Sequence, residues 1–215
     1  MSIAVAFLYF AVAVSGAGGM ALEMAASRLM LPFYGDSHII WANIIGLVLA
    51  ALTVGYYVGG AIVDRWPSRR LLSLLVVVSG LWTAVLPLVG SSWMAAIQNA
   101  FPITQTGFVV SSLLGVLILF ALPTFLLGCV PPFAIRLAMA DVRSAGYVAG
   151  RVYAVSTVGS MFGTFAPVLW LMPNLGVRTT FTVVAVVLLL TATLGLVLPG
   201  QRPLVSSLAD SQQSV

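Results

Sequence analysis

The chain has 215 residues, of which 61% are hydrophobic and only 7% are charged. A soluble domain carries about 25% charged residues, so a water-soluble fold of this composition would expose a large apolar surface. The pI of about 9.7 comes from arginines scattered between long apolar runs, without the basic and aromatic interleaving of a nucleic-acid-binding surface. The composition excludes a nucleic-acid partner and predicts an all-α integral membrane protein in contact with the lipid bilayer.

The chain contains few residues of the types that form metal sites, disulfides or catalytic sites. The single cysteine, Cys129, excludes an intramolecular disulfide and a thiolate metal cluster, and the single histidine, His38, cannot form a multi-histidine site. No strand, glycine-rich loop and helix follow one another as a nucleotide-binding unit requires. We therefore expect no metal, no cofactor and no enzymatic activity.

Hydropathy predicts the helices. Crossing the hydrocarbon core takes about 20 helical residues, and six apolar runs of about this length are separated by charges or prolines. The first is read as a retained helix and not a signal peptide, because Met1 to Val14 contains no Lys or Arg. One membrane domain over residues 1–200 and a polar cytoplasmic tail over 201–215 follow. The predicted helices cover residues 3–22, 39–63, 71–90, 108–130, 152–172 and 179–198.

Arginine placement predicts the orientation. The connections after the second and fourth helices and the tail carry most of the arginines, whereas the alternate connections carry only Arg28 and Arg178. Positively charged connections stay on the cytoplasmic side. This bias predicts a multi-pass protein of the cytoplasmic (inner) membrane with both termini in the cytoplasm. The cytoplasmic arginines are Arg65, Arg69, Arg70, Arg136, Arg143, Arg151 and Arg202.

The segment from Gly55 to Arg65 has the most specific spacing. Gly55 and Gly59 lie four residues apart on one helix face and allow a neighbouring backbone to approach closely. Two interpretations remain open, helix packing alone or a cytoplasmic charge cluster that holds one gating state. Gly60 belongs to the same packing segment, and Gly159 and Gly163 predict a second close contact. The predicted charge cluster contains Asp64, Arg65, Arg69, Arg70, Arg136 and Arg151.

Glu23 is the only acid within an otherwise apolar helical stretch, and Arg28 follows five residues later. A carboxylate at membrane depth costs several kcal/mol, so it usually has a partner or a function. It is interpreted either as a cation- or proton-binding group or as half of an ion pair that fixes the first helix. Tyr34, His38 and Trp41 follow in the connection to the second helix, where they either anchor the interface or line an entrance.

Several of these residues also resemble known patterns. Gly60, Asp64 and Arg65 are similar to the signature between the second and third helices of the major facilitator superfamily, although the three-residue spacer Trp66-Pro67-Ser68 places Arg69 one position late. Further blocks run from Glu23 to Gly46, over Pro131–Ala138 and from Gly150 to Gly176. Together they resemble the membrane domain of the fused major-facilitator/spermidine-synthase-like family.

This resemblance implies six helices equivalent to one half of a facilitator, with no soluble aminopropyltransferase domain. Three helices carry the chain across to the other side of the membrane. The second triplet of helices therefore enters from that opposite side, as in a 3+3 inverted repeat. Two chains would then form a twofold homodimer. We expect a small transporter or transporter-like protein that moves a cationic, polyamine-like substrate or an amphipathic or lipid substrate. The alternative is a non-catalytic membrane anchor or subunit for a separate aminopropyltransferase-like enzyme.

Overall fold

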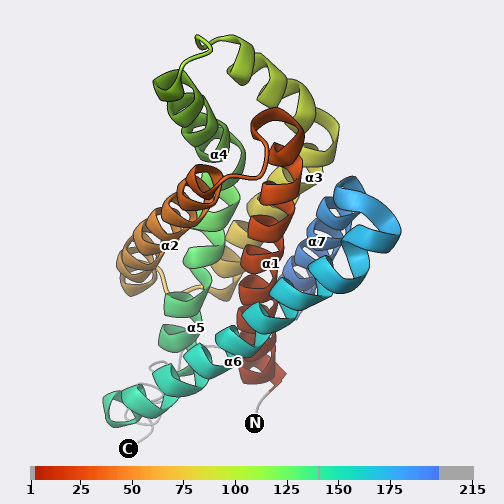
Figure 1. The fold of residues 1–215 in the computed structure, drawn as a ribbon. Coiled ribbons are helices and arrows are strands. Elements are labelled where there is room, and N and C mark those ends of the chain that lie inside the picture. Colours follow the sequence, from red (N-terminus) through yellow and green to blue (C-terminus); the bar gives the residue numbers. More distant parts are fainter. Residues whose placement is uncertain (1–2, 140, 199–215) are drawn as a thin grey trace, which may run out of the picture.

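The computed structural model describes residues 3–139 and 141–198, and the predicted tail over 201–215 lies outside this part. Every regular element in the described ranges is helical, and none is a strand. The prediction of an all-α fold is confirmed for these residues (Figure 1). The elements are α1 (Ile3–Tyr34), α2 (His38–Arg65), α3 (Arg69–Asn99), α4 (Gln105–Gly128), α5 (Val130–Ala138), η1 (Val142–Ser144), α6 (Ala145–Ala166), η2 (Pro167–Leu171) and α7 (Met172–Val197).

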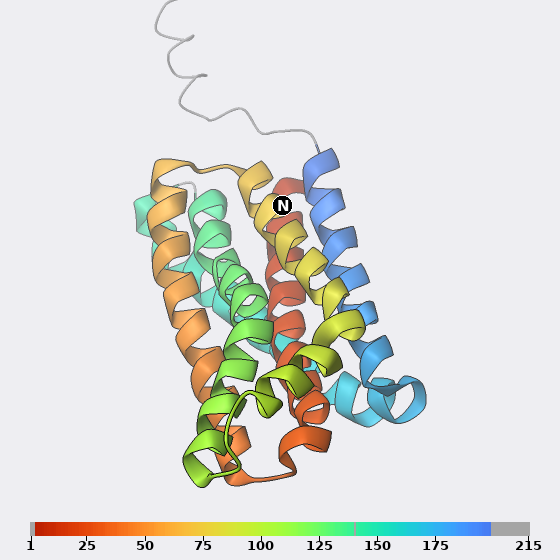
Figure 2. The same cartoon turned by 90° about the horizontal axis from the view of Figure 1, so that it is seen from above.

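Five helical stretches in the described part are long and apolar enough to cross a membrane, where the sequence predicts six. The last of them, Ala145–Val197, contains 53 residues and joins α6, η2 and α7. As one straight helix it would extend about 80 Å, well beyond a hydrocarbon core of about 30 Å. It bends at Gly176, where φ is 80° and ψ is 168°. Beyond this bend α7 runs back towards the other end of the bundle (Figures 1 and 2).

Several helices extend further than hydropathy predicts. The first predicted helix ends before Glu23, but α1 continues to Tyr34 because charged residues do not interrupt hydrogen bonding along a helix. It ends at Gly35, which adopts φ of 70° and donates its amide to Leu31 O at 2.9 Å. Likewise, α3 continues to Asn99. At 32 residues, α1 is about 48 Å long, so it reaches beyond the hydrocarbon core.

Hydroxyl side chains begin three of the helices. Ser37 accepts a hydrogen bond from Ile40 N at 3.4 Å, and Ser68 does the same for Leu71 N at 3.5 Å. Thr104 accepts from Gly107 N at 3.1 Å. Each cap satisfies an amide in the first turn, which has no partner within its own helix. These caps fix the starts of α2, α3 and α4.

The bundle has two distinct ends. The arginine-rich end contains the start of α1, the turn 66–68 and η1, whereas the opposite end contains the turn 35–37 and the loop 100–104 (Figure 2). Helix α1 lies in the middle of the bundle (Figure 2). The most extensive contacts pair α3 with α7, α1 with α6, and α2 with α4.

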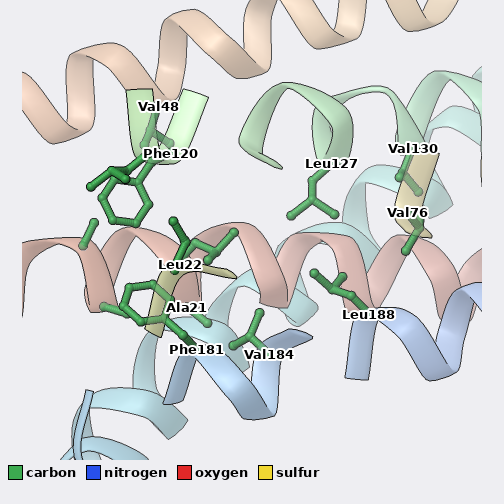
Figure 3. Packing of buried hydrophobic residues seen from close by; sticks show 14 of the residues in the cluster. Ala21, Leu22, Val48, Val76, Phe120, Leu127, Val130, Phe181, Val184 and Leu188 are labelled. Atoms are coloured by element: carbon green, nitrogen blue, oxygen red, sulfur yellow. The ribbon is translucent and has the colours of Figure 1, made fainter. Parts of the chain in front are cut away.

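A continuous apolar core joins these pairs (Figure 3). Leu22, Phe120, Phe181 and Leu188 are almost completely buried. The rings of Phe120 and Phe181 stack with their centroids 6.0 Å apart and an interplanar angle of 23°. Since lipid is as apolar as these side chains, close packing and not the hydrophobic effect stabilises the helix contacts.

Two glycine-lined contacts bring helix backbones together. Along α1 and α6, a Cβ added to Gly159 or Gly163 would lie less than 3.0 Å from the backbone of Ala13 or Ala17, respectively. Along α2 and α4, a Cβ on Gly55 would meet the backbone of Phe125 in the same way. We call these contacts the α1–α6 seam and the α2–α4 seam.

The α2–α4 seam uses only part of the predicted packing segment. Gly59 faces Cys129, and a Cβ added to Gly128 on the other helix would lie 3.0 Å from Leu52 O. Gly60 has open space around it and takes no part in the contact. One residue corresponds to about 100° of helix rotation, so Gly60 points away from α4.

Candidate functional site

Glu23 is the most unusual charged residue within the bundle. Only 8% of its surface is exposed, and it makes no hydrogen bond or ion pair with any residue that the structure describes. Arg28 is exposed and does not contact it. The two side chains diverge because five residues correspond to about 140° of rotation around the helix. The described contacts therefore do not include the ion pair that one interpretation of Glu23 requires. Glu23 is a buried acid without a protein partner among these residues.

The face of α1 that carries Glu23 contains one small residue, two polar residues and a methionine. Gly16, Met20, Glu23 and Ser27 recur at spacings of four, three and four, which places them on one side of the helix. We call this the Glu23 face. It lies between α2 and α6, because Gly16 contacts Ser156 of α6 while Met20 shares a hollow with α2.

A central hollow of about 50 Å³ adjoins the Glu23 face. Its walls come from α1, α2, α4 and α6, and polar groups face it from three of these helices. It is lined by Ser15, Gly16, Gly19, Met20, Val48, Leu52, Tyr56, Leu127 and Ser160. Glu23 follows one turn beyond Met20, on the side nearer to the opposite end.

A second hollow, of about 70 Å³, lies further along the same helix at the opposite end. Arg28, Asp36 and Trp41 all line it, together with Ser27. The Trp41 indole donates to Asp36 Oδ1 at 3.2 Å, which fixes the carboxylate at the start of α2. We call it the end hollow. Glu23 lies between the two hollows along the helix, so this face offers polar groups from the middle of the bundle to its end.

The structure separates the other predicted site residues. His38 is exposed and lines neither hollow. Tyr34 is buried and lines neither hollow, and its ring meets the edge of Phe108 of α4 at a centroid distance of 5.5 Å and 77°. Of the five predicted residues, Arg28 and Trp41 share the end hollow, Glu23 precedes it, and Tyr34 and His38 lie elsewhere.

The predicted cytoplasmic charge cluster is divided into separate contacts. Arg136 Nε of α5 lies 3.6 Å from Asp64 Oδ1 of α2, with both side chains largely exposed. The Arg69 guanidinium donates to Leu198 O at the end of α7. Arg151 lies over the Tyr9 ring at 4.9 Å and joins α6 to α1. Exposed ion pairs contribute about 0–1 kcal/mol, so the Arg136–Asp64 pair orients the ends of α2 and α5 more than it stabilises the fold.

Arg65 and Arg70 are exposed at the same end. The Arg151 guanidinium donates to the Tyr147 hydroxyl, also on α6, at 3.5 Å. The arginine-rich end therefore presents several cations to its surroundings, with Asp64 neutralising only Arg136 among the described residues.

Partly buried hydrogen bonds between helices were not predicted from the sequence. Pro123 has no amide hydrogen, so the carbonyl of Leu119 one turn earlier lacks its helical donor. The Trp82 indole of α3 donates to this carbonyl at 2.8 Å. Asn43 of α2 donates to Ser112 Oγ of α4 at 2.8 Å. The signal for the first contact is a proline inside an apolar run, which leaves an unpaired carbonyl that a buried donor can satisfy.

The comparisons with known proteins add no relative: family models, curated proteins and solved structures give no match. No group of three or more His, Cys, Asp or Glu in the described ranges is arranged to hold a metal ion. The length and composition of the five apolar stretches indicate a helical membrane protein.

Proposed function

We propose that this chain is a small membrane transporter or transporter-like protein whose substrate binds along the Glu23 face. The observation that carries the proposal is a buried carboxylate with no partner among the described residues, placed along α1 between the central hollow and the end hollow. A charge at membrane depth is costly and is usually found where an ion or substrate passes. A cationic substrate would supply the counter-charge that the protein does not.

The substrate class follows from this charge and from the resemblance to the spermidine-synthase-like family. An amine of the polyamine type would place one ammonium group against Glu23. Ser15, Ser160 and Tyr56 would offer hydroxyl groups to it along the central hollow. An amphipathic or lipid substrate is the second choice within this proposal, because the exposed surface beside α6 is apolar.

The proposed architecture has six spans, in which α4 and α5 form the fourth, α6 and η2 the fifth, and α7 the sixth. The bend at Gly176 supports this division. The two seams support an inverted repeat in which the first three spans correspond to the last three. In such a repeat α1 corresponds to α4 and α2 corresponds to α6, so the α1–α6 seam corresponds to the α2–α4 seam. Because α3 likewise corresponds to α7, the α3–α4 contact corresponds to the α7–α1 contact, and both contacts are observed.

The seams correspond residue by residue. On the central helix of each seam, which is α1 or α4, successive contact positions are three residues and then one residue apart. On the outer helix, which is α6 or α2, they are three and then four residues apart. The two helices of each seam run in the same direction. Helices α1 and α6 run towards the opposite end, and α2 and α4 run away from it. The positions on α1 and α4 are Ala13, Gly16, Ala17 and Phe125, Gly128, Cys129, and those on α6 and α2 are Ser156, Gly159, Gly163 and Leu52, Gly55, Gly59.

We further propose that the working unit is a homodimer in the cytoplasmic membrane, with the arginine-rich end in the cytoplasm. The Glu23 face lies between α2 and α6 and is covered by no further helix among the described elements. Tyr56 of α2, which lines the central hollow beside this face, is 43% exposed. A twofold partner would cover this face and complete a pathway from two chains.

Transport by purified protein in liposomes tests the proposal. With radiolabelled spermidine outside, uptake should exceed that of empty liposomes, and Glu23→Gln should lower the rate at least tenfold. Asp141→Asn, which removes an exposed acid from the connection before α6, is the matched control and should transport normally. Equal uptake by the wild type and Glu23→Gln, or no uptake of spermidine or of a fluorescent lipid, would contradict the proposal.

The arginine-rich end favours one alternative, a membrane anchor for a separate aminopropyltransferase-like enzyme. Trp66 is 60% exposed there, between Arg65 and Arg70, and the two hollows on the Glu23 face are small. An anchor needs an accessible surface and no substrate pathway. Co-purification of a soluble enzyme that is lost in the Trp66→Ala, Arg70→Ala variant, without any transport, would favour this function.

A further inference from the structure

A larger cavity lies at the opposite end of the bundle, beside the last turn of α1. Its volume is about 360 Å³, which is within the range of about 300–1,000 Å³ for small-molecule sites. The end of α1, the end of α3 and the start of α4 enclose it, together with the loop that joins α3 to α4. It is lined by Tyr34, Gln98, Phe101, Pro102, Ile103, Thr104, Gln105, Gly107, Phe108 and Ser111.

Tyr34 lines this cavity and carries a buried hydroxyl group that makes no hydrogen bond with a described residue. The residue is 5% exposed, and its hydroxyl has no hydrogen-bond partner among the described residues. A buried hydroxyl left in this state costs about 1–3 kcal/mol. A ligand acceptor that reached this hydroxyl group would meet a hydrogen that can rotate towards it. The ring is held in place by the edge-on contact with Phe108.

Amide and hydroxyl groups supply further binding capacity. Gln98 uses its amide nitrogen to donate to Phe33 O, which fixes the side chain and leaves its carbonyl oxygen available. Ser111 donates to Phe108 O at 3.2 Å and keeps its acceptor positions. Gln105 is exposed at the edge. The cavity therefore offers both donors and acceptors at fixed positions.

The lining contains no Asp, Glu, Arg or His among the described residues. A charged ligand would lose its hydration here without gaining a counter-charge. The rings of Phe101 and Phe108 provide apolar surface beside the polar groups. We propose that this cavity binds a small uncharged polyol or sugar, with Tyr34 and Gln98 bonding its hydroxyl groups. This cavity shares no lining residue with the central hollow or the end hollow, and the assignment does not rest on the transport proposal.

Equilibrium dialysis of radiolabelled D-glucose against protein in nanodiscs of phosphatidylcholine tests the assignment. Wild-type protein should bind glucose more tightly than glucuronate, or than glucosamine at mildly acid pH, by at least tenfold. Tyr34→Phe keeps the ring and should weaken glucose binding about tenfold, because a site built around a hydroxyl group loses that bond. Tyr57→Phe, at an exposed position on α2, is the matched control and should bind normally.

A second variant keeps the test independent of the buried tyrosine. Gln105→Glu places a carboxylate at the exposed edge of the cavity and should shift the preference from glucose to glucosamine. Glu23→Gln should leave glucose binding unchanged, which separates this site from the transport site. Failure of wild-type protein to bind glucose would overturn the proposal. Equal glucose affinity in the wild type and Tyr34→Phe, or an unchanged preference in Gln105→Glu, would do the same.

Discussion

Glu23 and Trp82 are two polar residues within the bundle that differ in whether their polar groups have hydrogen-bond partners. Trp82 bonds a carbonyl that Pro123 has left without a donor, so both polar groups are satisfied. Glu23 is buried without such a bond in the described part of the chain. A satisfied group stabilises the fold, whereas an unsatisfied charge lowers its stability and points to a ligand.

For Glu23 this difference gives a stability prediction. Glu23→Gln should leave the free energy of unfolding unchanged or raise it by about 1–2 kcal/mol, because a neutral amide is less costly to bury than an unpaired carboxylate. Thermal unfolding in detergent without substrate measures this. A loss of about 3–5 kcal/mol, which is typical when one half of a buried ion pair is removed, would show that Glu23 has a protein partner.

For Trp82 the opposite result is expected. Trp82→Phe should lower the free energy of unfolding by about 1–3 kcal/mol, since it leaves the Leu119 carbonyl buried without a donor. Trp170→Phe, on the exposed surface of η2, is the control and should change stability by less than about 0.5 kcal/mol. Similar unfolding temperatures for the two variants would contradict the role given to Trp82.

At the scale of the elements, Gly59 and Gly60 provide a matched pair within one helix. Gly59→Ala should lower stability by about 1–3 kcal/mol, because the added methyl group would meet the Cys129 backbone. Gly60→Ala should be neutral or stabilising by up to about 1 kcal/mol, because its surroundings are open and alanine favours the helix.

The corresponding position in the other seam should behave in the same way. Gly163→Ala, against the Ala17 backbone, is expected to cost as much as Gly59→Ala. Unfolding of all three variants in the same detergent compares them directly. Equal stability of Gly59→Ala and Gly60→Ala would contradict the packing, and a large difference between Gly59→Ala and Gly163→Ala would weaken the proposed repeat.

The sequence predicted the elements better than their contacts. Apolar runs identified the regions of α1 to α4, α6 and α7, and the four-residue spacing identified Gly55, Gly59, Gly159 and Gly163 at the seams. Hydropathy could not locate the ends of α1 and α3, because a helix continues past the point where its residues stop being apolar. The spacing also could not distinguish Gly59 from Gly60, since the direction of the neighbouring helix decides which glycine meets it.

The candidate site was predicted only in part. A lone acid in an apolar stretch was sufficient to select Glu23. Proximity in sequence suggested that Arg28, Tyr34, His38 and Trp41 act together, but successive helical residues point in different directions. Tyr34 therefore faces α4, whereas Arg28 and Trp41 face the end hollow. The cavity beside Tyr34 depends on residues from three helices, and no local pattern joins them.

At the scale of the whole molecule, the two ends should lie on opposite sides of the membrane. In a Cys129→Ala background, Ile103→Cys at the opposite end should react with an impermeant maleimide added to intact cells. Asp141→Cys at the arginine-rich end should react only after the cells are opened. Labelling of both positions from outside would contradict the proposed orientation and the assignment of six spans.

The central claim is that the buried Glu23 carboxylate binds a cationic substrate, and direct binding tests it without requiring transport. Spermidine affinity is measured by calorimetry on the purified protein in nanodiscs of uncharged lipid, for the wild type, Glu23→Gln and Asp141→Asn. We predict saturable binding to the wild type and to Asp141→Asn, and at least tenfold weaker binding to Glu23→Gln. Equal affinity in all three proteins, or no binding to the wild type, would contradict the claim.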